Sequence, residues 1–200
     1  MSGRPAITDH PVHPIIAERW SARAIDPDRP VEREKVLSML EAARWAPSCF
    51  GDQPWRYLVW DRFEDSEAWE QAAANLAEGN QAWARPSPIL ILAVAATTFS
   101  RNGKPNRWGQ YDTGAATENL HLQGVELGLV VHQMGGFDPD AARSLFGIPD
   151  DFEPMAMIAV GYPGQVADLP EGYQDSESAP RQRKPLAELA FRGSWDTPLT

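Results

Sequence analysis

The chain has 200 residues, which is enough for one domain with a sizeable hydrophobic core or for two very small ones. Hydrophobic residues make up 42% and charged residues 23%, so collagen-like, coiled-coil and wholly disordered classes are excluded. The formal net charge of −10 repels phosphate backbones, and we therefore expect no nucleic-acid partner.

Cysteine, histidine and hydropathy patterns exclude further classes. Cys49 is the single cysteine, so an internal disulfide and a zinc site made of several cysteines are excluded. The four histidines show no metal-ligand spacing, and we expect no metal site. The first 20 residues lack the apolar core of a signal peptide, and the longest apolar run, 89–96, is far shorter than the roughly 20 residues that cross a bilayer. We therefore expect a cytoplasmic protein without a membrane partner.

The apolar periodicity predicts alternating helices and strands after a lead-in, 1–12, that we expect to be flexible. The continuous apolar run at 89–95 is typical of a strand covered on both faces. In chain order the predicted elements are a helix at 14–20, a helix at 36–44, a strand at 55–60, a helix at 64–76, a strand at 89–95, a long helix at 112–129, a short strand at 129–132, a helix at 141–146 and a strand at 155–160. This alternation indicates one domain of the α+β or α/β class.

Asp112-Thr113-Gly114 has the sequence of the aspartic-protease triplet. Those enzymes use two such aspartates, in β-rich loops, that share a proton, whereas the residues after Asp112 predict a long helix. We interpret Asp112 or Thr113 as the N-cap of that helix instead.

Regular patterning ends after Gly161, because many prolines and glycines follow. A tail of about 40 residues rarely buries enough apolar surface to fold alone. The apolar residues Leu186, Leu189, Phe191 and Trp195 favour an arm that lies on another surface over a disordered tail.

Three polar segments can hold a ligand, although each also has a simpler interpretation. Arg19-Trp20-Ser21-Ala22-Arg23 offers guanidinium and hydroxyl donors for a phosphate, or is a solvated helix end. The loop 46–55 can stack and hydrogen-bond a flat ligand, or simply connects a helix to a strand. Arg181-Gln182-Arg183-Lys184 can bring cations to an anion, or is a solvated linker.

Two smaller features remain. Gly135-Gly136 lets the backbone approach a ligand closely, or forms an ordinary turn. Cys49 has no histidine among its sequence neighbours to activate it, so we interpret it as a small neutral pocket or core residue and not as a nucleophile.

Taken in order, these motifs resemble the FMN-dependent nitroreductase family from about residue 14 to residue 186. The matching motifs are Arg19-Trp20-Ser21-Ala22-Arg23, Ala46-Pro47-Ser48, Gln53-Pro54-Trp55, Gly135-Gly136-Phe137, Gly161-Tyr162-Pro163 and Arg183-Lys184-Pro185. The resemblance implies an α+β fold with a central β-sheet flanked by helices, in an intertwined homodimer. It also implies an FMN-binding domain at 13–163 and an extended C-terminal arm at 164–200 that packs on the partner subunit.

The resemblance further implies that FMN lies at the subunit interface. Arg19 and Ser21 would contact its phosphate and ribityl region, Arg181 and Arg183 would complete the phosphate cage, and Arg23 would face the pyrimidine edge of the ring. The partner subunit would supply the loop that lines the flavin, and the amides of the glycine pair would lie near flavin N5. The implied cofactor-binding residues are Arg19, Trp20, Ser21, Arg23, Pro47, Ser48, Cys49, Gln53, Gly135, Gly136, Arg181 and Arg183.

The implied activity is transfer of reducing equivalents from NAD(P)H through flavin N5 to a nitroaromatic, a quinone or a similar conjugated small molecule. The flavin carries the chemistry, so no side-chain general base is expected. Two alternatives remain open. One is a flavin protein of the same fold with other chemistry, such as reductive dehalogenation or flavin destruction. The other is a cofactor-free dimeric binding protein.

Overall fold

A four-stranded antiparallel sheet in the order β1-β2-β4-β3 forms the centre of the computed structural model, which describes residues 4–199. The strands are β1 (Trp55–Asp61), β2 (Ile89–Ala96), β3 (Val130–Met134) and β4 (Phe152–Gly161). The helices are α1 (Pro14–Glu18), α2 (Arg33–Arg44), α3 (Ser66–Ala74), α4 (Glu78–Ala84), α5 (Gly109–Glu126), α6 (Pro139–Phe146) and α7 (Glu171–Ser178). All predicted helices and strands are present, with shifted ends. The antiparallel pairing confirms the α+β class.

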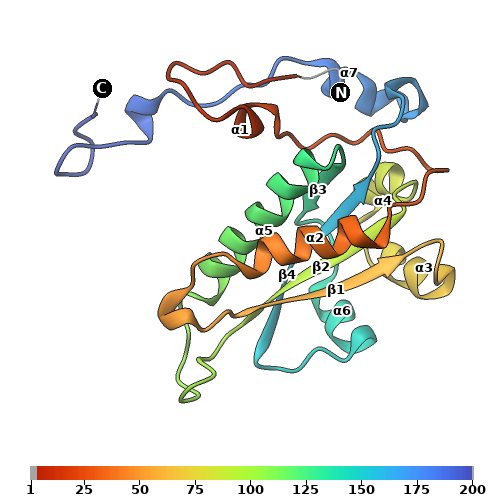
Figure 1. Cartoon of the computed structure of the whole chain (residues 1–200), viewed down its shortest axis with the longest axis horizontal. Helices are drawn as coiled ribbons and strands as arrows, with labels where there is room; N and C mark the ends of the chain where they lie inside the picture. Colours follow the sequence, from red (N-terminus) through yellow and green to blue (C-terminus); the bar gives the residue numbers. More distant parts are fainter. Residues whose placement is uncertain (1–3, 200) are drawn as a thin grey trace.

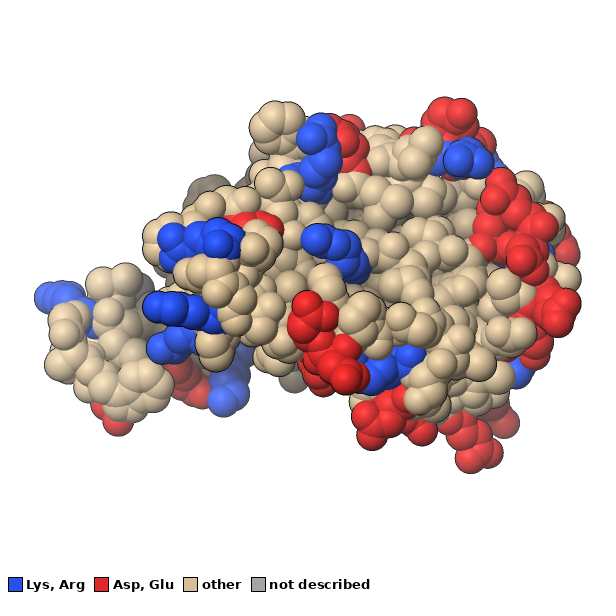
Figure 2. All heavy atoms as spheres, turned by 90° about the horizontal axis from the view of Figure 1, so that it is seen from below, with Lys and Arg blue, Asp and Glu red and all other residues tan. Residues whose placement is uncertain are grey.

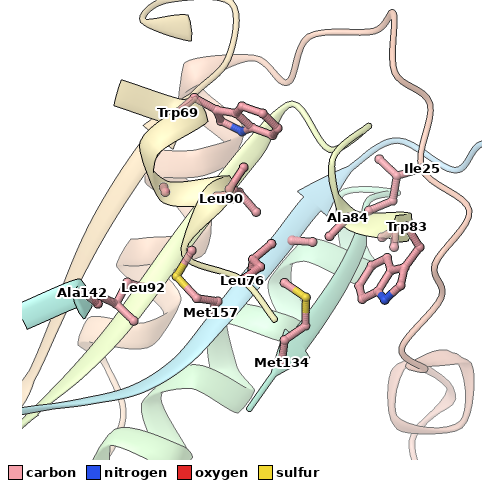
Figure 3. Close-up of a cluster of buried hydrophobic side chains, with 14 of the residues drawn as sticks. Ile25, Trp69, Leu76, Trp83, Ala84, Leu90, Leu92, Met134, Ala142 and Met157 are labelled. Atoms are coloured by element: carbon pink, nitrogen blue, oxygen red, sulfur yellow. The ribbon is translucent and has the colours of Figure 1, made fainter. Parts of the chain in front are cut away.

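Helices cover both faces of the sheet (Figure 1): α2 and α5 pack on one face, and α3, α4 and α6 pack on the other. Along β2, the even-numbered side chains from 90 to 94 enter one hydrophobic cluster and the odd-numbered side chains from 89 to 93 enter a second. This happens because successive side chains of a strand point to opposite faces. Figure 3 shows part of the first cluster, where Trp69 of α3 and Trp83 of α4 lie near the sheet. The expectation of a strand buried on both faces is confirmed.

The long helix α5 is apolar on two sides because it packs against both α2 and the sheet. Gly124 makes this packing possible. A Cβ atom at this position would lie 2.4 Å from Val131 Cγ2 in β3 and 3.1 Å from Met39 Cε in α2. The absence of a side chain therefore lets α5 approach both neighbours closely.

The start of α5 differs from the expectation. The helix begins at Gly109, and the N–H of its cap residue Trp108 donates to Asn106 Oδ1 at 3.0 Å. Asp112 lies inside the first turn, where its Oδ2 accepts the N–H of Cys49 at 2.9 Å. The prediction that Asp112 or Thr113 is the N-cap is therefore wrong, because Asn106 forms the turn that precedes the helix.

The sequence pattern does not predict α4 and α7. The expectation that prolines and glycines prevent regular structure after Gly161 is wrong for α7. This helix has no broad apolar stripe and is held by individual contacts with the body of the protein. Tyr173 Oη donates to the carbonyl of Gly79 at 2.6 Å, and the side chain of Glu177 is buried. Such a short helix depends on packing more than on its own propensity.

The tail passes α1 after α7 and then extends beyond the sheet (Figure 1). Its last described part forms a turn in which Phe191 pairs with Pro198 and the rings of Phe191 and Trp195 are 5.1 Å apart. The Trp195 side chain is 82% exposed. Among residues 4–199, no helix is both long enough and apolar enough to cross a membrane.

Candidate functional site

The segment 19–24 follows α1 without regular secondary structure; residues 19–21 and 23 are half-buried, and residues 22 and 24 are buried. Ala22 is buried, whereas Arg19, Ser21 and Arg23 are half-buried on the other side. His132 Nδ1 lies 2.9 Å from the Ala22 carbonyl, to which it donates, and this bond fixes the segment to β3. The three polar side chains consequently face the same side of the segment.

These side chains and the tail line an open hollow with a volume of about 250 Å³. Its lining includes the arginines of both predicted segments together with residues of α7 and the N-terminal part of the chain. The lining residues are Arg4, Arg19, Trp20, Ser21, Arg23, Ser176, Ala179, Pro180, Arg181 and Arg183. Residues more than 150 positions apart in the sequence are thus brought together.

Two carboxylates approach the five guanidiniums of the hollow. Arg19 Nε is 3.5 Å from Glu118 Oε1, and Arg23 Nη1 is 3.7 Å from Glu177 Oε2. The hollow therefore keeps an excess of positive charge on a chain of net charge −10. Figure 2 shows an uneven distribution on one face of the molecule, with most Lys and Arg toward the end that carries the tail and most Asp and Glu at the opposite end.

The electrostatics of the hollow favour an anion. Burial, followed by the charges of Arg19, Arg183 and Arg4, lowers the pKa of Arg181. The Nε atom of Arg23 is buried and has no hydrogen-bond partner within the described chain. A phosphate or similar oxyanion would reduce the repulsion between the guanidiniums and could accept charge-assisted hydrogen bonds.

Aromatic rings hold the Arg23 guanidinium. Its central carbon lies 5.8 Å from the ring centre of Trp83 in α4 and 5.6 Å from that of Tyr173 in α7, distances at which cations are attracted to ring faces. Arg23 Nη1 also lies 3.5 Å from Ser176 Oγ. Arg23 is therefore held between the body of the protein and the tail.

The pair Gly135 and Gly136 lies at the other end of α4. The carbonyl of Gly136 accepts Asn80 Nδ2 at 2.9 Å, and a Cβ atom at Gly136 would lie 2.6 Å from that nitrogen. A Cβ atom at Gly135 would meet nothing within 4 Å. The seven residues of α4, whose far end places Trp83 beside Arg23, span roughly 10 Å at the standard helical rise.

The loop with Pro47, Ser48, Cys49 and Gln53 does not line the arginine hollow. The loop is fixed elsewhere, near the beginning of α5. Cys49 N–H donates to the buried Asp112, and Gln53 N–H donates to Ser48 Oγ at 3.0 Å. Within one chain, the structure thus brings together Arg19, Trp20, Ser21, Arg23, Arg181 and Arg183 but not this loop. Its contribution from a partner subunit stays a prediction.

Two buried histidines lie behind the hollow. Burial is the main cause that lowers the pKa of both His121 and His132 to about 4, and the nearby charges of Arg19 and Arg23, respectively, add to the effect. Burial also raises the pKa of Glu118, which is partly opposed by Arg19. Both imidazoles are neutral at pH 7 and add no positive charge to the hollow.

Sequence reasoning misses several residues of this site. Arg4 lies in the segment interpreted as a lead-in, and Ser176 and Glu177 lie in a helix that was not predicted. A glutamate in a polar tail gives no sign that it is buried, so no sequence signal identifies Glu177. Among residues 4–199, no group of three or more His, Cys, Asp or Glu is arranged to hold a metal ion.

The family model described as the nitroreductase family matches residues 16–162, which is more than half of the chain. The chain belongs to the nitroreductase family. The matched residues contain Arg19, Ser21 and Arg23, the loop with Cys49, and the glycine pair. They do not include the tail that supplies Arg181 and Arg183 to the hollow.

Solved structures and a curated relative agree with this assignment. A protein described as an oxidoreductase containing FMN is 35% identical, with a TM-score of 0.89 and 96% of each chain covered. A Desulfovibrio desulfuricans protein in complex with FMN is 28% identical, with a TM-score of 0.72, covering 94% of this chain and 99% of that one. An NADH dehydrogenase of Thermus thermophilus is 26% identical over 193 residues, covering 81% of this chain and 86% of that protein.

Proposed function

We propose that this nitroreductase-family chain is an FMN-dependent oxidoreductase that takes reducing equivalents from NAD(P)H and passes them to a nitroaromatic, a quinone or a similar conjugated acceptor. The observation that supports it most directly is the convergence of five arginines on one hollow in an acidic chain. The similarity to an oxidoreductase containing FMN and to an NADH dehydrogenase supports the cofactor and the reductant.

The donor set of the hollow fits the phosphate end of FMN. Arg19 and Arg183 offer guanidinium forks, and Ser21 offers a hydroxyl group. Several guanidiniums of like charge gathered at one partly buried place repel one another, so a bound dianion would stabilise this arrangement. The residues present therefore fit the cofactor.

When bound, FMN would accept hydride from NAD(P)H and reduce the second substrate, while the protein supplies binding, orientation and electrostatics. In this proposal Arg23, held between Trp83 and Tyr173, would bind the pyrimidine edge of the ring and would stabilise negative charge there. The amides of Gly135 and Gly136 would bind the ring on the side of N5.

The proposed active form is an intertwined homodimer built from an FMN-binding domain at 13–163 and an arm at 164–200. The described chain leaves large apolar side chains exposed at the loop near α5 and along the arm. These residues are Phe50, Trp108, Tyr111, Leu186, Leu189 and Trp195. Exposed apolar surface of this kind is typical of an interface. In this assembly the partner subunit would supply Pro47, Ser48, Cys49 and Gln53 to the flavin.

The proposal is tested by adding FMN to the purified full chain and following NAD(P)H oxidation with and without a nitroarene. Binding of FMN and acceptor-dependent oxidation would support the proposal. Consumption of the flavin itself would instead support flavin destruction, and failure to bind FMN would support a cofactor-free binding protein.

A paired substitution tests the phosphate assignment. Because two charge-assisted contacts would be removed, the double variant Arg19→Ala/Arg183→Ala should bind FMN roughly a hundredfold or more weakly, as measured by quenching of flavin fluorescence. Arg33→Ala, which removes an exposed arginine at the beginning of α2, is the matched control. Unchanged FMN affinity in the double variant would refute the assignment.

A further inference from the structure

The carboxylate of Glu177 connects the tail to the arginine segment through the backbone. Its Oε1 accepts the N–H of Arg23 at 2.7 Å and the N–H of Ala24 at 3.2 Å. The Glu177 side chain is 1% exposed, and its Oε2 makes no hydrogen bond within residues 4–199, although Arg23 Nη1 lies 3.7 Å away. A buried carboxylate at this position therefore satisfies two backbone donors of the site.

The guanidinium of Arg181 makes a second connection, also to the backbone. Its Nη1 donates to the carbonyl of Arg4 at 2.8 Å and to that of Ala17 at 2.7 Å, and its Nη2 donates to the carbonyl of Arg19 at 2.7 Å. Three of its five N–H donors are therefore used before any ligand binds. Ala17 and Arg19 lie at the end of α1, where carbonyls lack helical partners.

Arg183 is different, although it lies only two residues further along the tail. Its single hydrogen bond within the described chain is from Nη1 to the carbonyl of Gln182 at 2.8 Å. The side chain lines the same hollow and is exposed. Most of its donors are free to reach an anion, so the two tail arginines differ in what they can bind.

We propose that Glu177 and Arg181 are positioning residues that fasten the tail to residues 17–24, and that Arg183, not Arg181, is the tail arginine that contacts the cofactor phosphate. Glu177 sets the backbone from which the Arg23 side chain extends, and Arg181 does the same at Arg19. The division of roles between the two tail arginines rests on the proposed function, whereas the fastening of the tail does not.

Hydrogen exchange in the flavin-free full chain tests the role of Glu177. Glu177→Ala leaves two backbone donors without an acceptor, so the amides of Arg23 and Ala24 should exchange roughly tenfold or more faster. Glu177→Gln keeps an acceptor oxygen and should retain most of the protection. Glu171→Ala, at an exposed position of α7, is the control. Unchanged exchange in Glu177→Ala, or equal losses in the Ala and Gln variants, would overturn this role.

The matched substitutions Arg181→Gln and Arg183→Gln separate positioning from phosphate binding. They also test the proposal if Glu177→Ala does not fold. In flavin-free protein, Arg181→Gln should increase amide exchange in α1 and at Arg19 roughly tenfold, whereas Arg183→Gln should not. Arg183→Gln should lower the preference for FMN over riboflavin, which lacks the phosphate, roughly tenfold or more.

Equal loss of the FMN preference in both variants, with exchange in α1 unchanged by Arg181→Gln, would identify Arg181 as a phosphate ligand and overturn the proposal. If the unsubstituted chain binds neither FMN nor riboflavin, the proposed function and the role of Arg183 fail. The exchange measurements then still decide whether Glu177 and Arg181 fasten the tail.

Discussion

At the scale of single residues, the site depends on polar side chains whose hydrogen-bond partners lie in distant parts of the chain. His132 is an example, since its Nδ1 donates to the Ala22 carbonyl while its ring lies 4.3 Å from that of Trp83. Burial accounts for most of the lowering of its pKa, to about 4. The folded protein therefore keeps this imidazole neutral under conditions in which an exposed histidine is protonated.

This lowered pKa predicts a dependence of stability on pH. The unfolded chain binds a proton at His132 below about pH 6.5, but the folded chain does so only near pH 4, so stability is lost as the pH falls through this range. The slope should be about 1.4 kcal/mol per pH unit for this histidine around pH 5. Urea unfolding between pH 4.5 and 7 measures this dependence. The unfolding free energy of His132→Gln should change less steeply with pH than that of the unsubstituted chain, by this amount around pH 5. Equal slopes for His132→Gln and the unsubstituted chain would contradict the prediction.

At the scale of elements, close packing of α5 sets the positions of the Arg19 segment and of the Cys49 loop. Glu118 in this helix lies beside Arg19, and Asp112 in its first turn holds the Cys49 loop. Gly124 permits the helix to lie this close to β3 and α2. A displacement of α5 would therefore move residues at both places.

Gly124→Ala should destabilise the protein by about 1–3 kcal/mol, because the new methyl group would collide with Val131 and Met39. Gly114→Ala, in the same helix, is the control: a Cβ atom there meets nothing within 4 Å, and alanine should stabilise the helix by about 0.5–1 kcal/mol. Chemical unfolding of the two variants measures the difference. A neutral Gly124→Ala would show that α5 is not closely constrained.

The elements that sequence reasoning predicts are those with a strong local pattern. The run 89–96 and the long helix that contains Leu120 are apolar enough to identify without tertiary information. By contrast, α7 is held in place by Tyr173 and Glu177, whose hydrogen-bond partners lie in distant parts of the chain. No local pattern contains those partners, so the helix and the buried carboxylate could not be predicted.

The residues of the site divide in the same way, into those that local motifs indicate and those that depend on contacts with distant parts of the chain. The order of the Arg19–Arg23, Cys49 and Arg183 segments was sufficient to suggest which residues belong together, and the structure brings the first and last of them to one hollow. The family resemblance placed Arg181 with Arg183 in the phosphate cage. Its hydrogen bonds to three backbone carbonyls depend on where α1 ends in space, which a motif does not specify.

At the scale of the whole molecule, the exposed apolar arm predicts self-association. Burial of Leu189 and Trp195 against a second copy would remove large apolar side chains from water, so the chain should sediment as a homodimer. The dissociation constant of the dimer, measured by analytical ultracentrifugation, should be roughly tenfold or more higher for the variant Leu189→Ser/Trp195→Ser. Arg192→Ser, in the same exposed arm, should leave this constant unchanged. A monomeric unsubstituted chain would contradict the prediction.

Arg4, near the N-terminus, meets the region around α7 at the hollow, since the carbonyl of Arg4 accepts Arg181 across 177 positions and Arg4 donates to the carbonyl of Glu177. Synthesis proceeds from the N-terminus, so these contacts must await residues 177–183. The last strand of the sheet ends at Gly161, so a ribosome that has just completed the sheet has not yet added the Arg183 segment. The complete set of cationic groups can therefore assemble only after the sheet has been synthesised, and a ligand that requires all of them is bound at a late stage of folding.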